Sequence, residues 1–149
     1  MANLPFANSY KDLIFYQKAR SVAKRVLELT GPFPKEERYS LTDQIRRSSR
    51  SVGAQIAEAW AKRRYPNHFA SKLTDADGEQ YETQHWIETA LDWGYTDTAD
   101  AEEINSVLQE IGRMLQRMID RAEEFKGYEP SCVREDAPTY GSIEEFFVN

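Results

Sequence analysis

The chain has 149 residues, enough for one domain with a buried core, and its 40% hydrophobic and 30% charged residues are ordinary for a folded protein. Its apolar runs are too short to span a bilayer, so no membrane partner is expected, and its one cysteine, Cys132, excludes an internal disulfide framework and a multi-cysteine zinc site. The formal net charge of −6 argues against a protein coated in positive charge, and these features together fit a reduced, cytoplasmic location.

Apolar residues at helical spacing predict a first helix from about Ser9 to Thr30. Ser9 can serve as its N-cap, and Gly31-Pro32 ends it, because proline removes a backbone donor and disfavours helix in the residue before it. The apolar stripe consists of Phe15, Ala19, Val22, Val26 and Leu29.

A second helix is predicted from about Ser40 to Arg64, where Tyr65-Pro66 closes it. Its apolar face is formed by Leu41, Ile45, Ser48, Val52, Ile56 and Ala59. The middle of the segment has little side-chain bulk, which allows a neighbouring helix to approach closely. These small residues are Ser48, Ser49, Ser51, Gly53, Ala54 and Ala57.

Two further helices follow. The third is predicted from Asn67, a suitable N-cap, to about Trp93, with Gly94 in the C′ position. Its heptad-like seam is Phe69, Leu73, Ala76, Gln80, Thr83, Ile87 and Ala90. The fourth is predicted from Thr98 or Asp100 to about Lys126, with Gly127 as its stop, and its seam is Ile104, Leu108, Ile111, Leu115, Met118, Ala122 and Phe125.

Four long helices joined by short connections favour an all-α, up-down-up-down four-helix bundle over residues 1–127. Beyond Gly127 the periodicity ends, so residues 128–149 are predicted to form an irregular C-terminal tail. Phe146 and Phe147 could dock this tail on a neighbour.

Charge is unevenly distributed along the chain. Residues 11–64 contain 13 Lys and Arg against 6 Asp and Glu, whereas residues 65–149 contain 6 against 19. This asymmetry permits an acidic partner for the first half or head-to-tail attraction between copies. Alternatively, the helices partly neutralise one another within one molecule.

Motifs for catalysis are weak. Glu82 and His85 form one Glu-x-x-His pair of the kind that di-iron bundles use twice, but the second pair is missing, so no metal is expected. Cys132 has no histidine near it in sequence, and no glycine-rich loop for a nucleotide occurs. The sequence therefore predicts a protein that is not an enzyme and uses no cofactor.

A polar stripe on the second helix is the most informative feature. Six residues at offsets of 0, 3, 7, 11, 14 and 18 share one face beside the apolar one: Gln44, Arg47, Ser51, Gln55, Glu58 and Lys62. The stripe could form a structural or subunit-interface network, contact nucleic acid, or be plain surface. Trp86 and Trp93 lie off the third seam and either widen the core or form a second apolar face that meets another subunit.

The nucleic-acid hypothesis rests on the arginines beside this stripe and on the basic run that ends the helix. Its candidate phosphate contacts are Arg46, Arg47, Arg50, Lys62, Arg63 and Arg64.

Several segments resemble a known family, the four-helix-bundle proteins encoded by 23S rRNA intervening sequences. They are Lys11-Asp12-Leu13-Ile14, Phe33–Tyr39, Leu41–Ser48, Ile56-Ala57-Glu58, Glu82-Thr83-Gln84, Trp86-Ile87 and Leu91–Tyr95. The resemblance covers residues 10 to 125, and it departs from the family pattern at Gly53, Gln55 and Ala59, where the family has Pro, Asn and Gly.

The resemblance implies a non-enzymatic scaffold or adaptor that forms a ring-like homo-oligomer such as a pentamer. Relatives include the accessory variability protein of diversity-generating retroelements, which binds a reverse transcriptase and nucleic acid. A nucleic-acid-binding accessory protein, with RNA, DNA or a reverse transcriptase as partner, is therefore the alternative expectation for this chain.

Overall fold

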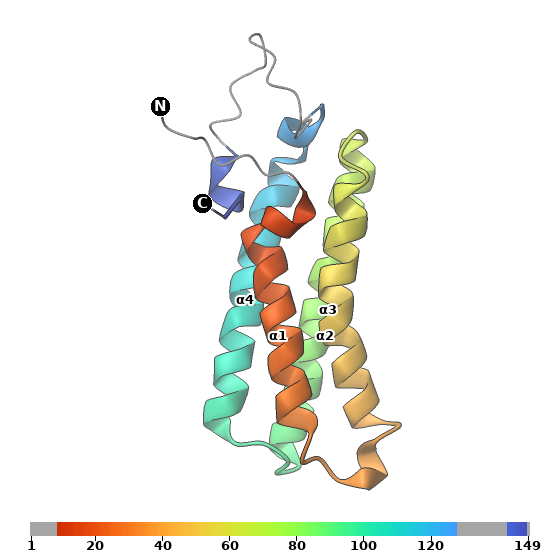
Figure 1. Cartoon of the computed structure of the whole chain (residues 1–149), viewed down its shortest axis with the longest axis vertical. Coiled ribbons are helices and arrows are strands. Elements are labelled where there is room, and N and C mark those ends of the chain that lie inside the picture. The colour runs from red at the N-terminus through yellow and green to blue at the C-terminus, as the bar shows by residue number, and fades with distance from the viewer. Residues whose placement is uncertain (1–8, 128–142, 149) are drawn as a thin grey trace.

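The structure is a computed structural model that describes residues 9–127 and 143–148. Within these residues, four α-helices follow one another: α1 (Ile14–Thr30), α2 (Leu41–Trp60), α3 (Pro66–Asp92) and α4 (Thr98–Asp120). They run alternately up and down, and each packs on two neighbours, α1 on α2 and α4, and α3 on α2 and α4 (Figure 1). The predicted all-α four-helix bundle is confirmed.

The core is built from the apolar seams that the sequence indicates. The large residues of the α4 seam, Ile104 to Met118, are at most 2% exposed, because they recur every three or four positions and face the bundle axis. All seven predicted seam residues of α3 are buried, including the polar Gln80 and Thr83. No helix of the described residues is long and apolar enough to cross a membrane.

The starts of α1 and α3 differ from the predicted ones, whereas α4 begins at Thr98 as predicted. Ser9 caps a separate 3-10 turn, η1 (Tyr10–Asp12), and the extended Leu13 separates this turn from α1. Helix α3 begins at Pro66 with Tyr65 in the N-cap position, so Asn67 is not the cap. Proline suits this place because the first turn of a helix does not need its backbone donor.

Two helices also end earlier than predicted. Helix α2 stops at Trp60, and residues 61–64 form a turn. Helix α4 stops at Asp120 and continues as a 3-10 turn, η3 (Ala122–Phe125), which keeps Phe125 in the core. Gly94 ends the α3 region with a φ of +77°, as expected for a glycine in the C′ position.

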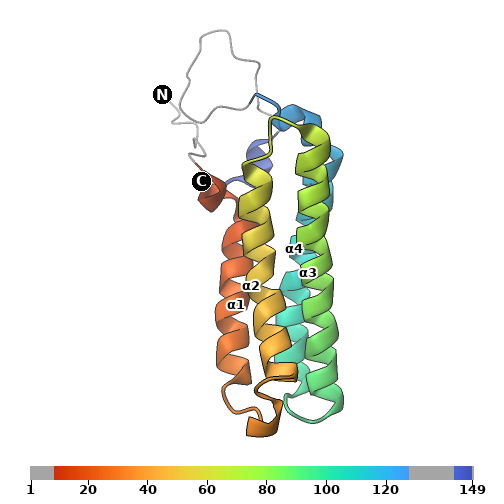
Figure 2. The ribbon, with the colours of Figure 1, turned by 90° about the vertical axis from the view of Figure 1, so that its right-hand side faces the viewer.

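The connections alternate between the two ends of the bundle. A 3-10 turn, η2 (Lys35–Glu37), joins α1 to α2, and the segment around Gly94 joins α3 to α4 at the same end (Figure 2). The opposite end, drawn uppermost in Figure 1 and called the upper end below, carries η1, the α2–α3 turn and η3.

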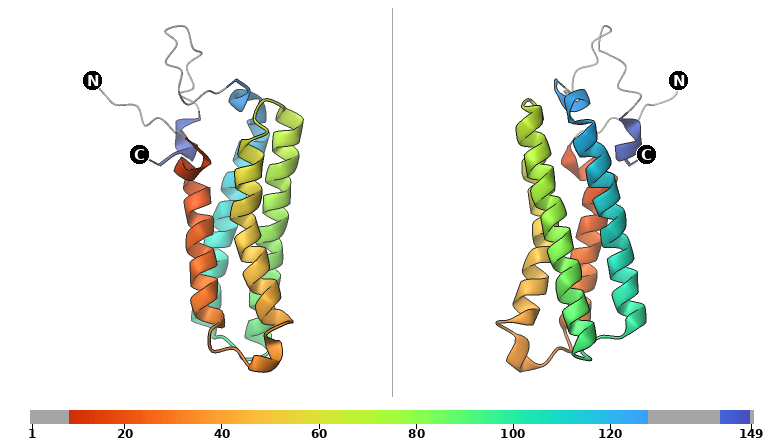
Figure 3. Two further views of the ribbon diagram at one scale, coloured as in Figure 1. Left: turned by 45° about the vertical axis from the view of Figure 1, so that its right-hand side comes forward. Right: turned by 180° about the vertical axis from the view of Figure 1, so that it is seen from behind.

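The upper end also holds the last described segment, which contains η4 (Glu144–Phe146) (Figure 3). Phe146 and Phe147 of the predicted tail are 0% and 5% exposed and pack on the bundle of their own chain. The remainder of that predicted tail, residues 128–142 and 149, lies outside the described residues.

Candidate interaction surface

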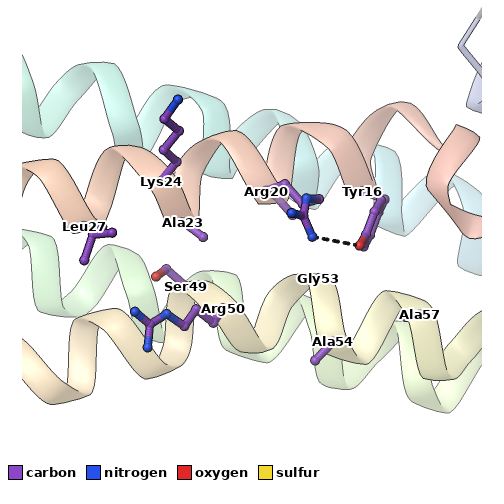
Figure 4. Close-up of a pocket in the computed structure, with 11 residues that line it drawn as sticks. Tyr16, Arg20, Ala23, Lys24, Leu27, Ser49, Arg50, Gly53, Ala54 and Ala57 are labelled. Carbon is purple, nitrogen blue, oxygen red and sulfur yellow. Dashed lines mark hydrogen bonds between the residues drawn. The ribbon is translucent and has the colours of Figure 1, made fainter.

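A groove of about 560 Å³ runs along the outer side of the bundle between α1 and α2 (Figure 4). Its eleven lining residues come from these two helices alone: Tyr16, Ala19, Arg20, Ala23, Lys24, Leu27, Ser49, Arg50, Gly53, Ala54 and Ala57. Both helices present small residues here, so the helix backbones lie open between the larger side chains. The groove is therefore a shallow channel parallel to the bundle axis.

The floor of the groove is determined by residues that lack bulk. A Cβ atom added at Gly53 would lie 3.6 Å from Cε2 of Tyr16, an ordinary contact, so the Tyr16 ring packs against this glycine. Ala54 and Ala57 continue the low surface along α2, while the exposed Leu27 forms part of the α1 side. A segment that enters the groove can consequently approach the α2 backbone closely.

Three of the described residues that line the groove are cations, and none of them is a carboxylate. Helix α1 supplies Arg20 and Lys24, and α2 supplies Arg50; Figure 4 shows the Lys24 side chain at the rim, extending away from α2. Arg20 donates a hydrogen bond of 3.4 Å to the Tyr16 hydroxyl, and among residues 9–127 and 143–148 none of the three cations forms an ion pair. The groove is thus a positively charged surface on an acidic chain.

The cations on the opposite side of α1 are paired within the molecule. Arg25 contacts Asp100 at 2.9 Å and Glu103 at 3.2 Å. The hydrogen bond to Glu103 makes the largest contribution to raising the pKa of Arg25, and the charges of both carboxylates raise it further. Lys18 pairs with Glu110 at 3.2 Å. The partial neutralisation expected between helices therefore occurs at the α1–α4 contact and does not extend to the groove.

The polar stripe of α2 lies along the α2–α3 contact, on a different side from the groove. The carboxylate of Glu58 accepts from Lys72 of α3 at 2.9 Å, an interaction that lowers the pKa of Glu58 and raises that of Lys72. The side-chain amide oxygen Oε1 of Gln55 is buried and has no hydrogen-bond partner among the described residues. Gln44 and Ser51 are half-buried on the same stripe.

Arg47 of the stripe faces the acidic side of α3. Its charge acts on Glu79, where it opposes the larger effects of burial and of the neighbouring Glu82, which together raise the pKa of Glu79. The stripe is thus used at least partly within the chain, in contacts between α2 and α3.

The six cations proposed for phosphate contact do not form one surface. Arg50 lines the groove, and Arg46 donates to the Thr30 hydroxyl at 2.8 Å. Arg63 stacks its guanidinium over Trp60, 3.8 Å from the ring centroid. Lys62 and Arg64 are exposed in the turn after α2, at the upper end.

The two tryptophans have different surroundings. Trp86 is half-buried against the core, and its indole N–H donates to Glu82 at 3.1 Å. Trp93 is 61% exposed and lies beside Tyr95, with ring centroids 6.2 Å apart. Trp86 thus widens the core stripe of α3, while Trp93 presents an exposed ring just after the end of that helix.

The Glu82 and His85 side chains are exposed, and His85 packs edge-on against the Trp86 ring at 4.7 Å. In the part of the chain that the structure describes, no group of three or more His, Cys, Asp or Glu side chains could hold a metal ion. Cys132 lies outside the described residues.

Sequence reasoning missed Arg20 and Lys24, the α1 side of the groove. A signal was present, because Tyr16, Arg20, Ala23 and Leu27 recur at helical spacing beside the apolar stripe. This stripe of α1 forms the groove together with Arg50 and Gly53 of α2 only because the two helices are rotated so that these faces meet. The residue pattern of a single helix does not specify that rotation.

Comparisons with known proteins agree with this architecture. A family model described as 23S rRNA-intervening sequence protein matches residues 11–117. The chain is also similar to the crystal structure of a protein with unknown function from the S23 ribosomal protein family of Bacteroides thetaiotaomicron, with 30% sequence identity and a TM-score of 0.65. The match covers 72% of this chain and 96% of that one, whereas no curated protein matches.

Proposed function

Because the chain belongs to the 23S rRNA-intervening sequence protein family, we propose that it is a non-enzymatic cytoplasmic scaffold that assembles from copies of itself, with the α1–α2 groove as a contact surface. One observation carries the proposal: the bundle separates its charges onto opposite helix pairs. Helices α1 and α2 contain seven Lys and Arg against three Asp and Glu, whereas α3 and α4 contain three against eleven. The molecule is thus electrostatically complementary to a second copy of itself.

The groove suits a helix as its occupant. Its low floor at Gly53, Ala54 and Ala57 lets a helix come near α2, and Arg20, Lys24 and Arg50 can reach carboxylates on that helix. The acidic counterpart is a second groove of about 600 Å³ along α3 and α4, with Glu88, Asp92 and Glu102 in its lining.

Contacts between two different faces are head-to-tail and generate either closed rings or open filaments. A ring such as a pentamer satisfies every groove and every acidic face, so we propose a closed ring.

Light scattering across a range of concentrations tests the proposal. At about 50 mM salt, where screening is weak, we expect a mass several times that of the chain. Arg50→Glu should shift the protein toward the monomer, and adding Glu102→Arg on the acidic face should restore part of the assembly. Arg38→Glu is the matched control, because it makes the same charge change at an exposed residue outside the groove. A monomer at every concentration would refute the scaffold.

Nucleic acid is the second candidate ligand, favoured by the three groove cations that form no ion pair among the described residues. Phosphate binding predicts affinity for RNA or DNA that falls steeply with salt, and a salt slope that decreases by about 1 for each phosphate-binding cation that is removed. Arg20→Ala and Lys24→Ala test these two cations by fluorescence anisotropy. No binding at about 50 mM salt would dispose of this candidate.

A further inference from the structure

The upper end of the bundle contains an aromatic pocket filled by the C-terminal segment of residues 143–148. Phe125 is the central wall, with its ring centroid 5.5 Å from Phe69 and 6.5 Å from Trp60. Phe146 lies 5.7 Å from Phe125, and Phe147 lies 6.0 Å from Trp60. The segment that fills the pocket lies beyond residues 11–117, the part of the chain matched by the family model.

Polar contacts hold the main chain and one carboxylate of this segment. Leu13 and Phe147 form an antiparallel β-bridge, and the backbone N–H of Val148 donates to the carbonyl of Asp12 at 2.8 Å. The guanidinium of Arg121 binds Glu145 and lies 5.4 Å from the Phe146 ring centroid.

These contacts are the parts of a peptide-recognition site. Main-chain pairing, apolar pockets for side chains and a cation for a carboxylate recur in protein sites that bind short peptides. Here the segment contains the 3-10 turn η4, and its buried side chains are Ile143, Phe146 and Phe147. The specificity read from the contacts is a buried hydrophobic residue, an acidic residue two positions later and two aromatic residues after it. In this chain they are Ile143, Glu145, Phe146 and Phe147.

We propose that the upper end of the bundle is a peptide-binding site and that residues 143–148 of a second copy occupy it in exchange for the chain's own. Fifteen residues separate Gly127 from Ile143, and a chain of this length spans at most about 50 Å. This reach exceeds the length of α3, roughly 40 Å, so the chain length permits docking on an adjacent copy. A second copy offers the identical ligand, so exchange needs no new interface. The proposal does not rest on the proposed function, because pocket and ligand lie outside the groove.

Disulfide trapping between two full-length variants tests this exchange. One variant carries Asp12→Cys and the other Val148→Cys, both carry Cys132→Ser, and tags of different size distinguish them. Residues 12 and 148 flank the bridge as an opposed pair, and opposed residues have Cα atoms about 5.5 Å apart, within disulfide range. A heterodimer between the two variants forms only when a segment crosses between copies.

We expect the heterodimer on a non-reducing gel at roughly five times or more the yield obtained when Ser21→Cys replaces Asp12→Cys, because docking raises the local thiol concentration. Ser21 is exposed on α1 and lines neither groove. Excess free peptide with the sequence of residues 142–149 should lower the yield, and the same peptide with both phenylalanines changed to alanine should not. A yield equal to the control, or one that the peptide leaves unchanged, overturns the proposal.

Discussion

At the residue scale, Gly53 combines two roles, because it keeps the groove floor low and weakens the helix that forms it. Glycine within a helix costs about 1 kcal/mol relative to alanine, and α2 contains Gly53 near its middle. The nearest side-chain atom to an added Cβ lies 3.6 Å away, so a methyl group fits without strain.

We therefore predict that Gly53→Ala raises the free energy of unfolding by about 0.5–1 kcal/mol in urea denaturation. Gly78→Ala, where an added Cβ meets nothing within 4 Å, should give a similar gain. Gly112→Ala should gain less or lose stability, because its Cβ would lie 2.8 Å from Nε2 of the buried Gln80. Equal gains at all three positions would contradict this account of their packing.

A buried hydroxyl pair joins α2 to α3. The Thr83 hydroxyl lies 2.9 Å from the Ser48 hydroxyl, to which it can donate, and both residues are at most 2% exposed. The Thr83 hydroxyl also lies 2.8 Å from the Glu79 carbonyl, and Thr83→Val keeps the shape but removes both contacts, so we expect a loss of about 1 kcal/mol. Thr74→Val is the control, since Thr74 donates to the Ala70 carbonyl at 2.9 Å but is exposed on the same helix, and its replacement should cost little. Urea denaturation of the two variants measures the difference.

At the element scale, the helix seams could be predicted from sequence and several helix ends could not. The seams depend on burial, which repeats along the whole helix and averages over local exceptions. The ends depend on single residues: Leu13 takes an extended conformation, α2 stops after Trp60, and Pro66 starts α3. At each of these places tertiary packing and local turn chemistry decide between conformations of similar energy.

The candidate surface was only partly predictable for a related reason. The pattern of α2 located Gln44 to Glu58 on one face but did not show that α3 would face that stripe. Arg50 was among the basic candidates, whereas its groove partners Arg20 and Lys24 belong to another helix. A surface made by two helices requires their mutual rotation, which no single-helix periodicity contains.

The acidic contacts of α3 lead to a pH-dependent prediction for Glu79. Burial first, and then the charge of Glu82, raise the pKa of Glu79 above its ordinary value. The ionised carboxylate therefore costs stability above the folded-state pKa, and protonation removes this cost as the pH falls through that value. We expect Glu79→Gln to stabilise the protein near about pH 7 and to lose that advantage near about pH 4.

Urea denaturation at the two pH values measures this effect, with Glu123→Gln, the same change at an exposed residue outside both grooves, as control. An advantage of Glu79→Gln that grows as the pH falls would have the opposite sign and would contradict the assignment.

At the scale of the whole molecule, internal ion pairs and charge separation act together. The α1–α4 contact uses Arg25 and Lys18 to hold acidic residues of α4, which leaves Arg20, Lys24 and Arg50 facing outward on the other side. Because charges separated by more than about 10 Å are screened at moderate salt, the two faces act on partners largely independently. A chain with a net charge of −6 can therefore still present a basic surface.

Substitutions within residues 143–148 can lower the free energy of unfolding only by a limited amount. Replacing a buried phenylalanine in a core by alanine typically costs about 3–5 kcal/mol, because a cavity remains. Phe146 belongs to a short segment held by one β-bridge, the Val148 backbone bond and the Arg121 contacts, so the segment can leave the pocket instead of enclosing a cavity. The loss from any single change is then limited to the free energy with which the segment docks.

We predict that Phe146→Ala, the double change Phe146→Ala with Phe147→Ala, and deletion of residues 143–149 all reduce the free energy of unfolding by the same amount, about 2–4 kcal/mol. The equality follows because each change releases the same segment, so the effects do not add. Urea denaturation at one protein concentration gives the three values, and Val148→Ala, at a 37% exposed position, serves as the control. A deletion that costs clearly more than Phe146→Ala would show that the segment stays docked without this ring.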